Sequence, residues 1–396
     1  MHIRTRILTV AMAIVASGTP ALSQCEPALL GQLELLDDPR GVASMGNFSF
    51  VTAGSTGVRV VDMSDPASPV VVATIDTPGT AQDIAAAGGM LFVADGPGGL
   101  EIYGLADPLN PEPLGSLAFA DGGAVDMVGI AMDGTTAYMI DSITGLRVVD
   151  VSDPGEPVQT GQDPDVPDTM LRASKVAVSG DTAVVSYLRF HPNGEPGVRL
   201  LNIASSPVPV GWVGIPGEPS GIALRGDSLF VGDFIGAQLR AYDASDASSP
   251  IPVGMTPVEQ IVDLAVDGGE LFVLTRNGGL RLIDALSPST LPELGSITTP
   301  DNATCVGVSG STALIADGGL SVPFDRVPHL SLVAVGPCQA GCPADFTGEG
   351  VLDIFDVFGY LNAFSTGSSA ADFTGDGSLD IFDVFAFLDA FGAGCP

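Results

Sequence analysis

Lysine is almost absent from this chain of 396 residues, and bases of any kind are few. Lys175 is the only lysine, and 14 lysines and arginines stand against 47 aspartates and glutamates, for a formal net charge of −33. A chain this acidic repels the phosphate backbone of nucleic acids and the surface of anionic membranes. We therefore expect no nucleic-acid partner.

Histidine is scarce too, with three in the chain. His191 and His329 are far apart, and neither lies in an H-E-x-x-H motif or beside a nucleophile motif. No glycine-rich phosphate loop is present, because residues 95–99 are interpreted as a turn between strands. Acid pairs such as Asp62 and Asp65 recur with a repeat described below and are interpreted as turn caps. No catalytic constellation is recognisable, and we predict that the protein is not an enzyme.

The chain lacks long apolar runs outside the N-terminus. None of the later runs reaches the roughly 18 residues that a membrane span needs. The N-terminus has the three parts of a signal peptide: Arg4 and Arg6, an apolar stretch at 7–16, and a small-residue cleavage site at 21–23. We predict that residues 1–23 are removed and that the protein is secreted or displayed at the cell surface. Lipidation of Cys25 is the alternative.

The five cysteines show no C-x-x-C zinc spacing, and an exported chain can keep disulfides. Cys342 and Cys395 bracket the C-terminal segment, and we predict that they pair, stabilising it by about 4 kcal/mol in the chain-entropy model. Cys25 and Cys338 would join the two ends of the larger domain. Cys305 lies in an apolar strand and is expected to be a buried free thiol.

What the chain has in abundance is one repeated strand. Residues 145–154 read G-L-R-V-V-D-V-S-D-P, an alternating strand that Asp-Pro terminates. Copies begin at Gly57, Gly99, Gly145, Gly197, Gln238, Gly279 and, imperfectly, Gly319. A short apolar strand precedes each copy, at intervals of 42 or 46 residues, beside Gly41, Asp83, Gly129, Lys175, Gly221, Asp263 and Cys305.

Four short strands in each unit of about 40–45 residues are typical of a β-propeller blade. We therefore predict an all-β fold, a seven-bladed β-propeller with four-stranded blades over residues 24–337. The last blade takes its first three strands from residues 305–324. Its outer strand comes either from residues 27–35, which would close the ring, or from residues 330–335.

The repeated strand resembles the LVIVD repeats of secreted or surface-bound bacterial β-propellers, and the resemblance covers roughly residues 26–337. It implies a propeller and little about chemistry.

The bases suggest one candidate binding face. Five arginines at one repeat position are interpreted as blade-surface residues: Arg59, Arg147, Arg199, Arg240 and Arg281. Other bases lie in or beside loops that share one face of the ring, namely Arg172, Lys175, Arg189, His191 and Arg276. With Tyr187, Asp83 and Asp263 placed at the mouth of the central channel, we hypothesise that this face binds an anionic or polar ligand. The alternative is a set of scattered, solvated bases.

Two nearly identical segments, 345–364 and 372–391, lie 27 residues apart at the C-terminus. Each begins with the spacing of a twelve-residue calcium loop with glycine at position 6. The predicted ligands are Asp345, Thr347, Glu349, the Val351 carbonyl, Asp353 and Asp356, and then Asp372, Thr374, Asp376, the Ser378 carbonyl, Asp380 and Asp383. Clustered carboxylates repel one another without a cation, so calcium should drive folding, with the second site tighter. The alternative is two acidic turns that bind nothing.

A helix is expected after each loop, with apolar stripes at Val357, Leu361 and Phe364 and at Val384, Leu388 and Phe391. A loop with an exit helix, duplicated, resembles the dockerin family. The resemblance implies that residues 345–396, reached through a linker at 338–344, form a protein-binding or sorting module. In dockerins, loop positions 10 and 11 contact the cohesin partner. In this chain the residues at these positions are apolar, namely Ile354, Phe355, Ile381 and Phe382. They indicate either a different receptor or positions in the core.

Together these features predict a non-enzymatic binding or scaffold protein outside the cell. The propeller would be the head that binds a ligand or partner, and the tail would bind an extracellular or cell-surface protein receptor. The alternative is that the propeller is an extracellular hydrolase or lactonase that acts on carbohydrate and is attached through the same tail. A purely structural surface protein would have no ligand pocket.

Overall fold

The computed structural model describes residues 27–35, 39–119, 125–163, 172–188, 196–299, 302–318, 328–335, 354–365, 371, 373 and 381–393. The chain divides into two units, a β-propeller and a smaller helical unit, and each is described by itself. The predicted signal peptide, the predicted linker and four of the five cysteines (Cys25, Cys338, Cys342 and Cys395) fall outside the described residues.

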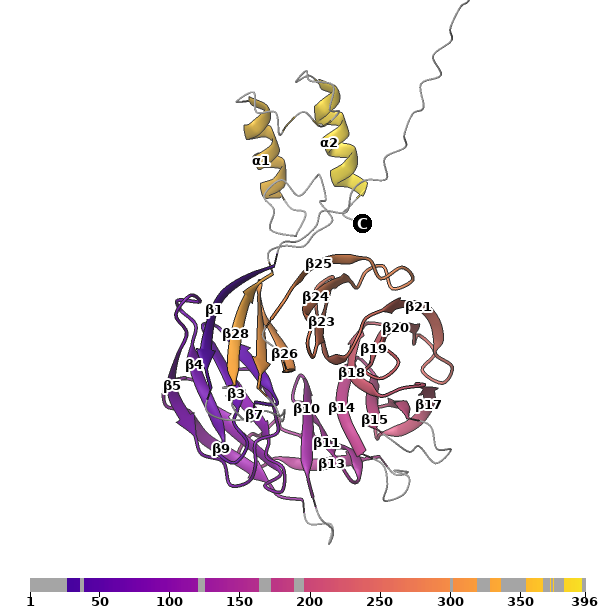
Figure 1. The fold of residues 1–396 in the computed structure, drawn as a ribbon. Helices are drawn as coiled ribbons and strands as arrows, with labels where there is room; N and C mark the ends of the chain where they lie inside the picture. Colours follow the sequence, from indigo (N-terminus) through magenta and orange to yellow (C-terminus); the bar gives the residue numbers. More distant parts are fainter. Residues whose placement is uncertain are drawn as a thin grey trace, which may run out of the picture. The chain divides into compact units, whose positions relative to one another are not determined.

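Seven four-stranded antiparallel sheets form the propeller, as the repeats predict (Figure 1). In blades 1 to 6 the strands follow chain order from the inner to the outer edge. Blade 1 has β2 (Val42–Met45), β3 (Phe48–Thr52), β4 (Val58–Asp62) and β5 (Val70–Ile75); blade 2 has β6 (Asp83–Ala87), β7 (Met90–Ala94), β8 (Leu100–Gly104) and β9 (Glu112–Leu117); blade 3 has β10 (Met127–Asp133), β11 (Thr136–Asp141), β12 (Gly145–Asp150) and β13 (Val158–Gln162).

The same order continues through the next three blades. Blade 4 has β14 (Arg172–Ser179), β15 (Thr182–Leu188), β16 (Gly197–Asn202) and β17 (Val208–Gly214); blade 5 has β18 (Pro219–Arg225), β19 (Ser228–Asp233), β20 (Gln238–Asp243) and β21 (Ile251–Pro257); blade 6 has β22 (Ile261–Asp267), β23 (Glu270–Thr275), β24 (Gly279–Asp284) and β25 (Glu293–Ile297).

The seventh blade joins the two ends of the propeller chain and closes the ring. From the inner edge outwards it contains β26 (Ala303–Ser309), β27 (Thr312–Asp317), β28 (His329–Ala334) and β1 (Ala28–Glu34). Residues 27–35 therefore supply the outer strand, which settles the two alternatives. Closure leaves no blade incomplete, so no inner strand edge stays open to pair with another chain.

The third strand of this blade corrects one prediction. The imperfect copy at Gly319 was expected to supply it, but β28 does, and Gly319 lies outside the described residues. Leu330 and Leu332 pair with Ala316 and Leu314, in the register that Leu146 and Val148 have in blade 3. The physical reason is that the copy at Gly319 contains Pro323, which has no backbone N–H to donate to a strand ladder. β28 can complete that ladder.

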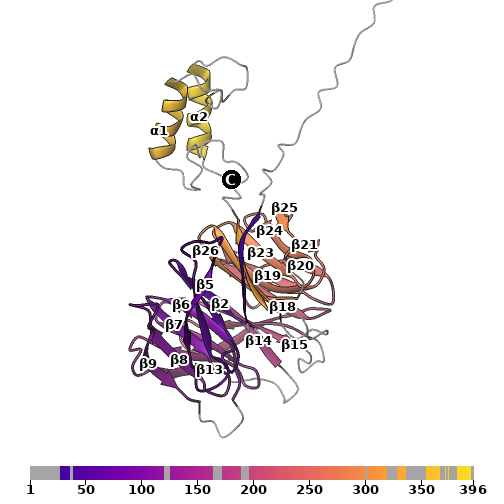
Figure 2. The ribbon, with the colours of Figure 1, turned by 60° about the vertical axis from the view of Figure 1, so that its left-hand side comes forward.

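The hydrophobic core lies between neighbouring sheets. Each cluster of buried side chains draws on two adjacent blades; one example unites Leu100 and Ile102 of blade 2 with Met127 and Met139 of blade 3. The inner strands of successive blades contact one another all the way round, including β26 with β2 (Figures 1 and 2). The ring is therefore held by a continuous series of equivalent inter-blade contacts.

Outer strands add a second kind of inter-blade contact. A register shift in blade 5 places Gly254 opposite Ala241, and a Cβ on Gly254 would overlap the carbonyl oxygen of Pro288 in blade 6. The same approach recurs between Gly115 and Pro154 and between Gly211 and Ala247. These glycines let the strand backbone touch the turn of the next blade, which a side chain would prevent.

The helical unit contains α1 (Ile354–Ser365) and α2 (Ile381–Ala393), where the sequence predicts helices. Tyr360, Ala371 and Phe387 form its buried core, and the predicted stripe residues Val357, Phe364, Val384 and Phe391 pack around them. Leu361 and Leu388 do not, because they are 45% and 46% exposed. The buried face of the two helices is centred on the larger aromatic rings at Tyr360 and Phe387. The two leucines therefore lie outside that face.

Candidate functional site

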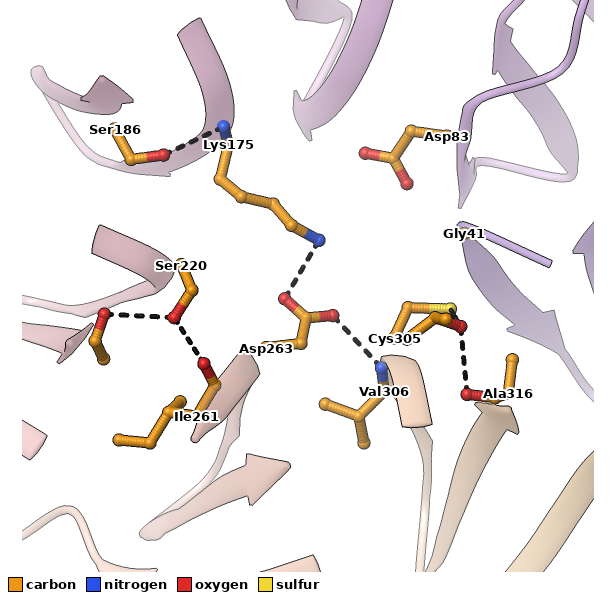
Figure 3. Close-up of polar contacts among 12 residues, drawn as sticks. Gly41, Asp83, Lys175, Ser186, Ser220, Ile261, Asp263, Cys305, Val306 and Ala316 are labelled. Carbon is orange, nitrogen blue, oxygen red and sulfur yellow. Dashed lines mark hydrogen bonds and ion pairs between the residues drawn. The ribbon is translucent and has the colours of Figure 1, made fainter. Parts of the chain in front are cut away.

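The centre of the ring brings together one residue from each blade, which lies in the inner strand or, in blade 1, directly before it. These residues occupy one repeat position, and in order from blade 1 to blade 7 they are Gly41, Asp83, Gly129, Lys175, Gly221, Asp263 and Cys305. Asp83 and Asp263, which we predicted at the channel mouth, converge there with Lys175 from three separate inner strands (Figure 3). The repeat thus gives blades 2, 4 and 6 a charge and blades 1, 3 and 5 a glycine.

Lys175 reaches across this centre to Asp263. Its Nζ lies 3.0 Å from Asp263 Oδ1, while Asp263 Oδ2 accepts a hydrogen bond of 3.1 Å from the Val306 backbone N–H in blade 7. Asp83 makes the matching contact between blades 2 and 3, because its Oδ2 accepts a hydrogen bond of 3.0 Å from the Ile130 N–H. Both carboxylates are therefore tied to the backbone of the following blade.

Burial and charge act in opposite directions on these groups. Burial raises the pKa of the Asp83 carboxyl to about 6, against the attraction of Lys175. For Lys175 burial would lower the pKa, but the charges of Asp263 and Asp83 outweigh it, and the net pKa is raised. Burial raises the pKa of the neighbouring Cys305 thiol to about 12, so it is neutral at physiological pH. As predicted, Cys305 is buried and free.

Tyr187 is not at the channel mouth, which corrects that placement. Its side chain is fully buried, its ring centroid lies 6.2 Å from that of Trp212, and its hydroxyl lies 3.4 Å from Asp163 Oδ2. Arg199 binds the same Asp163 oxygen at 3.1 Å. Burial raises the pKa of Tyr187, so the phenol stays protonated. Tyr187 is a core residue of blade 4.

The other bases of the hypothesised face are held by their neighbours. Arg172 Nη1 donates to Ser142 Oγ at 3.3 Å, and the Arg276 guanidinium lies 4.6 Å from the centre of the Phe234 ring. Arg189 and His191 lie outside the described residues. The structure therefore gathers Lys175, Asp83 and Asp263 at the centre, whereas Arg172 and Arg276 are exposed residues of separate blades.

The sequence suggested that all five arginines at one repeat position lie on the blade surface. One of the five is in the core instead. Arg147 is fully buried, and its Nη2 lies 3.0 Å from Asp141 Oδ2. Asp141 ends the second strand of blade 3, and Asp95, Asp233 and Asp317 hold the same repeat position in other blades, all of them buried. The sequence prediction did not include these aspartates, although they lie one or two repeats of 42 or 46 residues apart, which could have revealed them.

The acid pairs are turn caps, as predicted. Asp62 Oδ1 accepts a hydrogen bond from the Ser64 N–H at 2.8 Å, and Asp65 Oδ1 accepts one from the Ala67 N–H at 3.1 Å. The hydrogen bonds from Ser64 lower the pKa of Asp62. These carboxylates close the turn between the third and outer strands, so they have a structural role.

In the helical unit, Asp356 and Asp383 are fully buried in the first turns of α1 and α2. The other predicted calcium ligands lie outside the described residues. Ile354 and Ile381 are exposed, so for these two the alternative of core positions is wrong. The side chains of Phe355 and Phe382 are outside the described set. Within that set, no helix is long and apolar enough to cross a membrane.

Comparison with known proteins agrees with this architecture. A closed ring of seven four-stranded blades defines the class, a seven-bladed β-propeller. The LVIVD repeat matches residues 38–77, 78–115 and 126–162, which correspond to blades 1, 2 and 3. These blades are therefore LVIVD repeats. A search of curated proteins found no match.

Three solved structures share the fold at low identity. A chain of the mitotic checkpoint complex has 15% identity, covers 84% of this chain and 99% of its own, and has a TM-score of 0.61. The computationally designed protein Ika8 has 11% identity, coverage of 73% and 84%, and a TM-score of 0.54. Sqt1 of Saccharomyces cerevisiae has 10% identity, coverage of 78% and 98%, and a TM-score of 0.52. At such identities the likeness concerns the fold alone.

Proposed function

We propose that this is a secreted or cell-surface binding protein, in which the propeller is a rigid head and the C-terminal helical unit attaches it to an extracellular protein receptor in a calcium-dependent manner. The LVIVD repeats and the closed ring support a binding or scaffold role for the head. The two central carboxylates already bind backbone N–H groups, and Lys175 pairs with one of them. This arrangement favours a structural centre over a reactive one.

The observation that carries the proposal is a duplicated apolar surface on the two helices. Six large apolar side chains are each between 45% and 59% exposed: Ile354, Phe358 and Leu361 on α1, and Ile381, Phe385 and Leu388 on α2. The two sets are related by the 27-residue repeat. Exposed apolar clusters of this kind mark sites of protein interaction. We name these six residues the helix surface patch.

Calcium fits the acids at the ends of the two predicted loops. Asp356 and Asp383 hold position 12 of the two predicted loops, and both carboxylates are fully buried. Calcium would be held by the oxygen ligands predicted in residues 345–356 and 372–383, and when bound it would neutralise their mutual repulsion. The helices would then present the patch in a fixed arrangement.

The experiment is fractionation of cells that express the full chain, a chain ending at Pro337, or the full chain with Phe358→Asp and Phe385→Asp. We expect the full chain to stay with the cells, and the other two, or the full chain with EGTA, to appear in the medium. Leu109→Asp is the matched control, because Leu109 is a propeller residue with 48% exposure. Retention of the truncated chain would overturn the proposal.

A further inference from the structure

The centre of the propeller contains the only lysine of the chain, and its surroundings are specific. Lys175 Nζ lies 3.0 Å from Asp263 Oδ1, and the Asp83 carboxylate faces the same ammonium group (Figure 3). The lysine begins in blade 4 and pairs with blade 6, so the contact crosses the position of blade 5. An ion pair between non-adjacent blades joins parts of the ring that their sheets do not connect.

The glycines of the same ring position make room for this contact. A Cβ on Gly41 would lie 2.6 Å from Asp83 Oδ1, and a Cβ on Gly221 would lie 2.9 Å from the backbone of Asp263. Both distances are shorter than ordinary contacts, so a larger residue would displace the aspartates. Small residues in blades 1, 3 and 5 and charged residues in blades 2, 4 and 6 therefore form one arrangement.

The aspartates extend the connection to the next blades. Asp83 binds the backbone of blade 3 through Ile130, and Asp263 binds that of blade 7 through Val306. With Lys175 of blade 4, the three side chains touch blades 2, 3, 4, 6 and 7. An ammonium is a compact charge with three donors on a flexible stem, which suits a position between two carboxylates.

We propose that Asp83, Lys175 and Asp263 form a cross-channel ionic lock that holds alternate blades in fixed positions about the axis. The lock occupies the centre with a cation that the chain itself supplies. It goes beyond the proposed binding function, because it assigns a mechanical role to residues that do not depend on the tail or its receptor. Ligand binding by the propeller then belongs to its rims.

The direct test uses the fact that Lys175 is the only lysine. The full chain labelled with ¹⁵N-lysine gives one side-chain ammonium signal, which needs no assignment. We expect its hydrogens to exchange slowly at pH 7 and the group to remain protonated above pH 10.5, the ordinary lysine pKa. Asp263→Asn should accelerate exchange at least tenfold. Fast exchange and titration near the ordinary value in the unchanged protein would overturn the lock.

Urea unfolding of the full chain gives an independent measurement. Lys175→Met leaves two carboxylates without their cation, and we expect it to lower the folding equilibrium constant at least tenfold. Adding Asp263→Asn should recover part of that loss, since the two changes remove one interaction. Arg281→Met is the control, because its ion pair with Glu293 is exposed. Strictly additive effects, or equal effects of Lys175→Met and Arg281→Met, would refute the lock.

Discussion

Tyr360 and Phe387 stack face to face in the helical unit, with ring centroids 4.1 Å apart and planes inclined by 2°. The two residues hold the same position in segments that are 27 residues apart. The duplicated sequence therefore meets itself in space, and each copy provides half of a shared aromatic core.

Loss of either ring should destabilise the helical unit. We expect Tyr360→Ala or Phe387→Ala to cost about 3–5 kcal/mol, because each ring is buried in a small core. The helical circular dichroism of the full chain in excess calcium measures this, since the described propeller consists of strands. Phe358→Ala is the matched control, because Phe358 is 59% exposed. Equal melting of the control and the core variants would contradict the expectation.

Gly254 should not tolerate a side chain. Gly254→Ala would force apart the outer strand of blade 5 and the Pro288 turn of blade 6, and we expect a loss of about 1–3 kcal/mol in urea unfolding. Gly155→Ala is the control, because the nearest atom to its Cβ would be 3.4 Å away. A native midpoint for Gly254→Ala would show that this inter-blade contact is not tight.

Removal of Arg147 should have a much larger effect than removal of an exposed arginine. Arg147→Met leaves Asp141 buried without its guanidinium, and breaking a buried pair costs about 3–5 kcal/mol. Arg281→Met breaks the exposed pair with Glu293, which is worth about 0–1 kcal/mol. Comparison of the two unfolding midpoints checks the prediction, and similar midpoints would argue against it.

Glu101 is an exception within its repeat position, and reversing its charge should stabilise blade 2. In blades 3 and 5 an arginine there faces an aspartate, at 3.0 Å for Arg147 and 3.7 Å for Arg240. In blade 2, burial and then the charge of Asp95 raise the pKa of Glu101 to about 7. We expect Glu101→Arg to raise the free energy of unfolding by about 1 kcal/mol. Glu112→Arg makes the same change of charge at an exposed site and should have little effect.

The stability of the propeller should fall as the pH rises from about 4 to about 7. Burial raises the pKa of Asp83 and of Asp317 to about 6, and that of Glu101 to about 7. Because each proton is bound more tightly in the folded state, protonation stabilises the fold, and this contribution is lost as pH rises through these values. Urea midpoints in excess calcium should be higher at pH 5 than at pH 8.

The variant Asp317→Asn with Glu101→Gln is the control for this pH dependence. It removes two of the three groups, so the difference in midpoint between pH 5 and pH 8 should shrink. The same difference in the variant and the unchanged protein would assign the pH dependence to other groups.

The number and composition of the blades could be predicted from the sequence because the repeat fixes both. The spacing from Gly41 to Cys305 already places seven equivalent residues, and alternation within each strand defines its buried face. Residues Asp83, Lys175 and Asp263 could be placed near the channel for the same reason. Their pairing could not, because it depends on which side chains cross the ring.

The errors arose where tertiary packing decided between local alternatives. Arg147 matches half-buried arginines in sequence, but its side chain is fully buried beside Asp141. Tyr187 lies near the end of β15 and packs against Trp212 in the outer strand of its own blade. In blade 7, the pattern at Gly319 is closer to the repeat than that at Leu330, but the strand that pairs with β27 and β1 is β28.

The pairing of β1 with β28 makes the order of synthesis matter. Ala28 and Ala334 are partners, so the first described strand of the propeller to be synthesised can pair only after the last one is made. Until then six blades can form but cannot join into a ring, and the growing chain has an unmatched strand at its start. Folding is therefore completed in a single late step, after translation of the propeller has ended. A protein exported as an unfolded chain would meet that requirement on the outer side of the membrane.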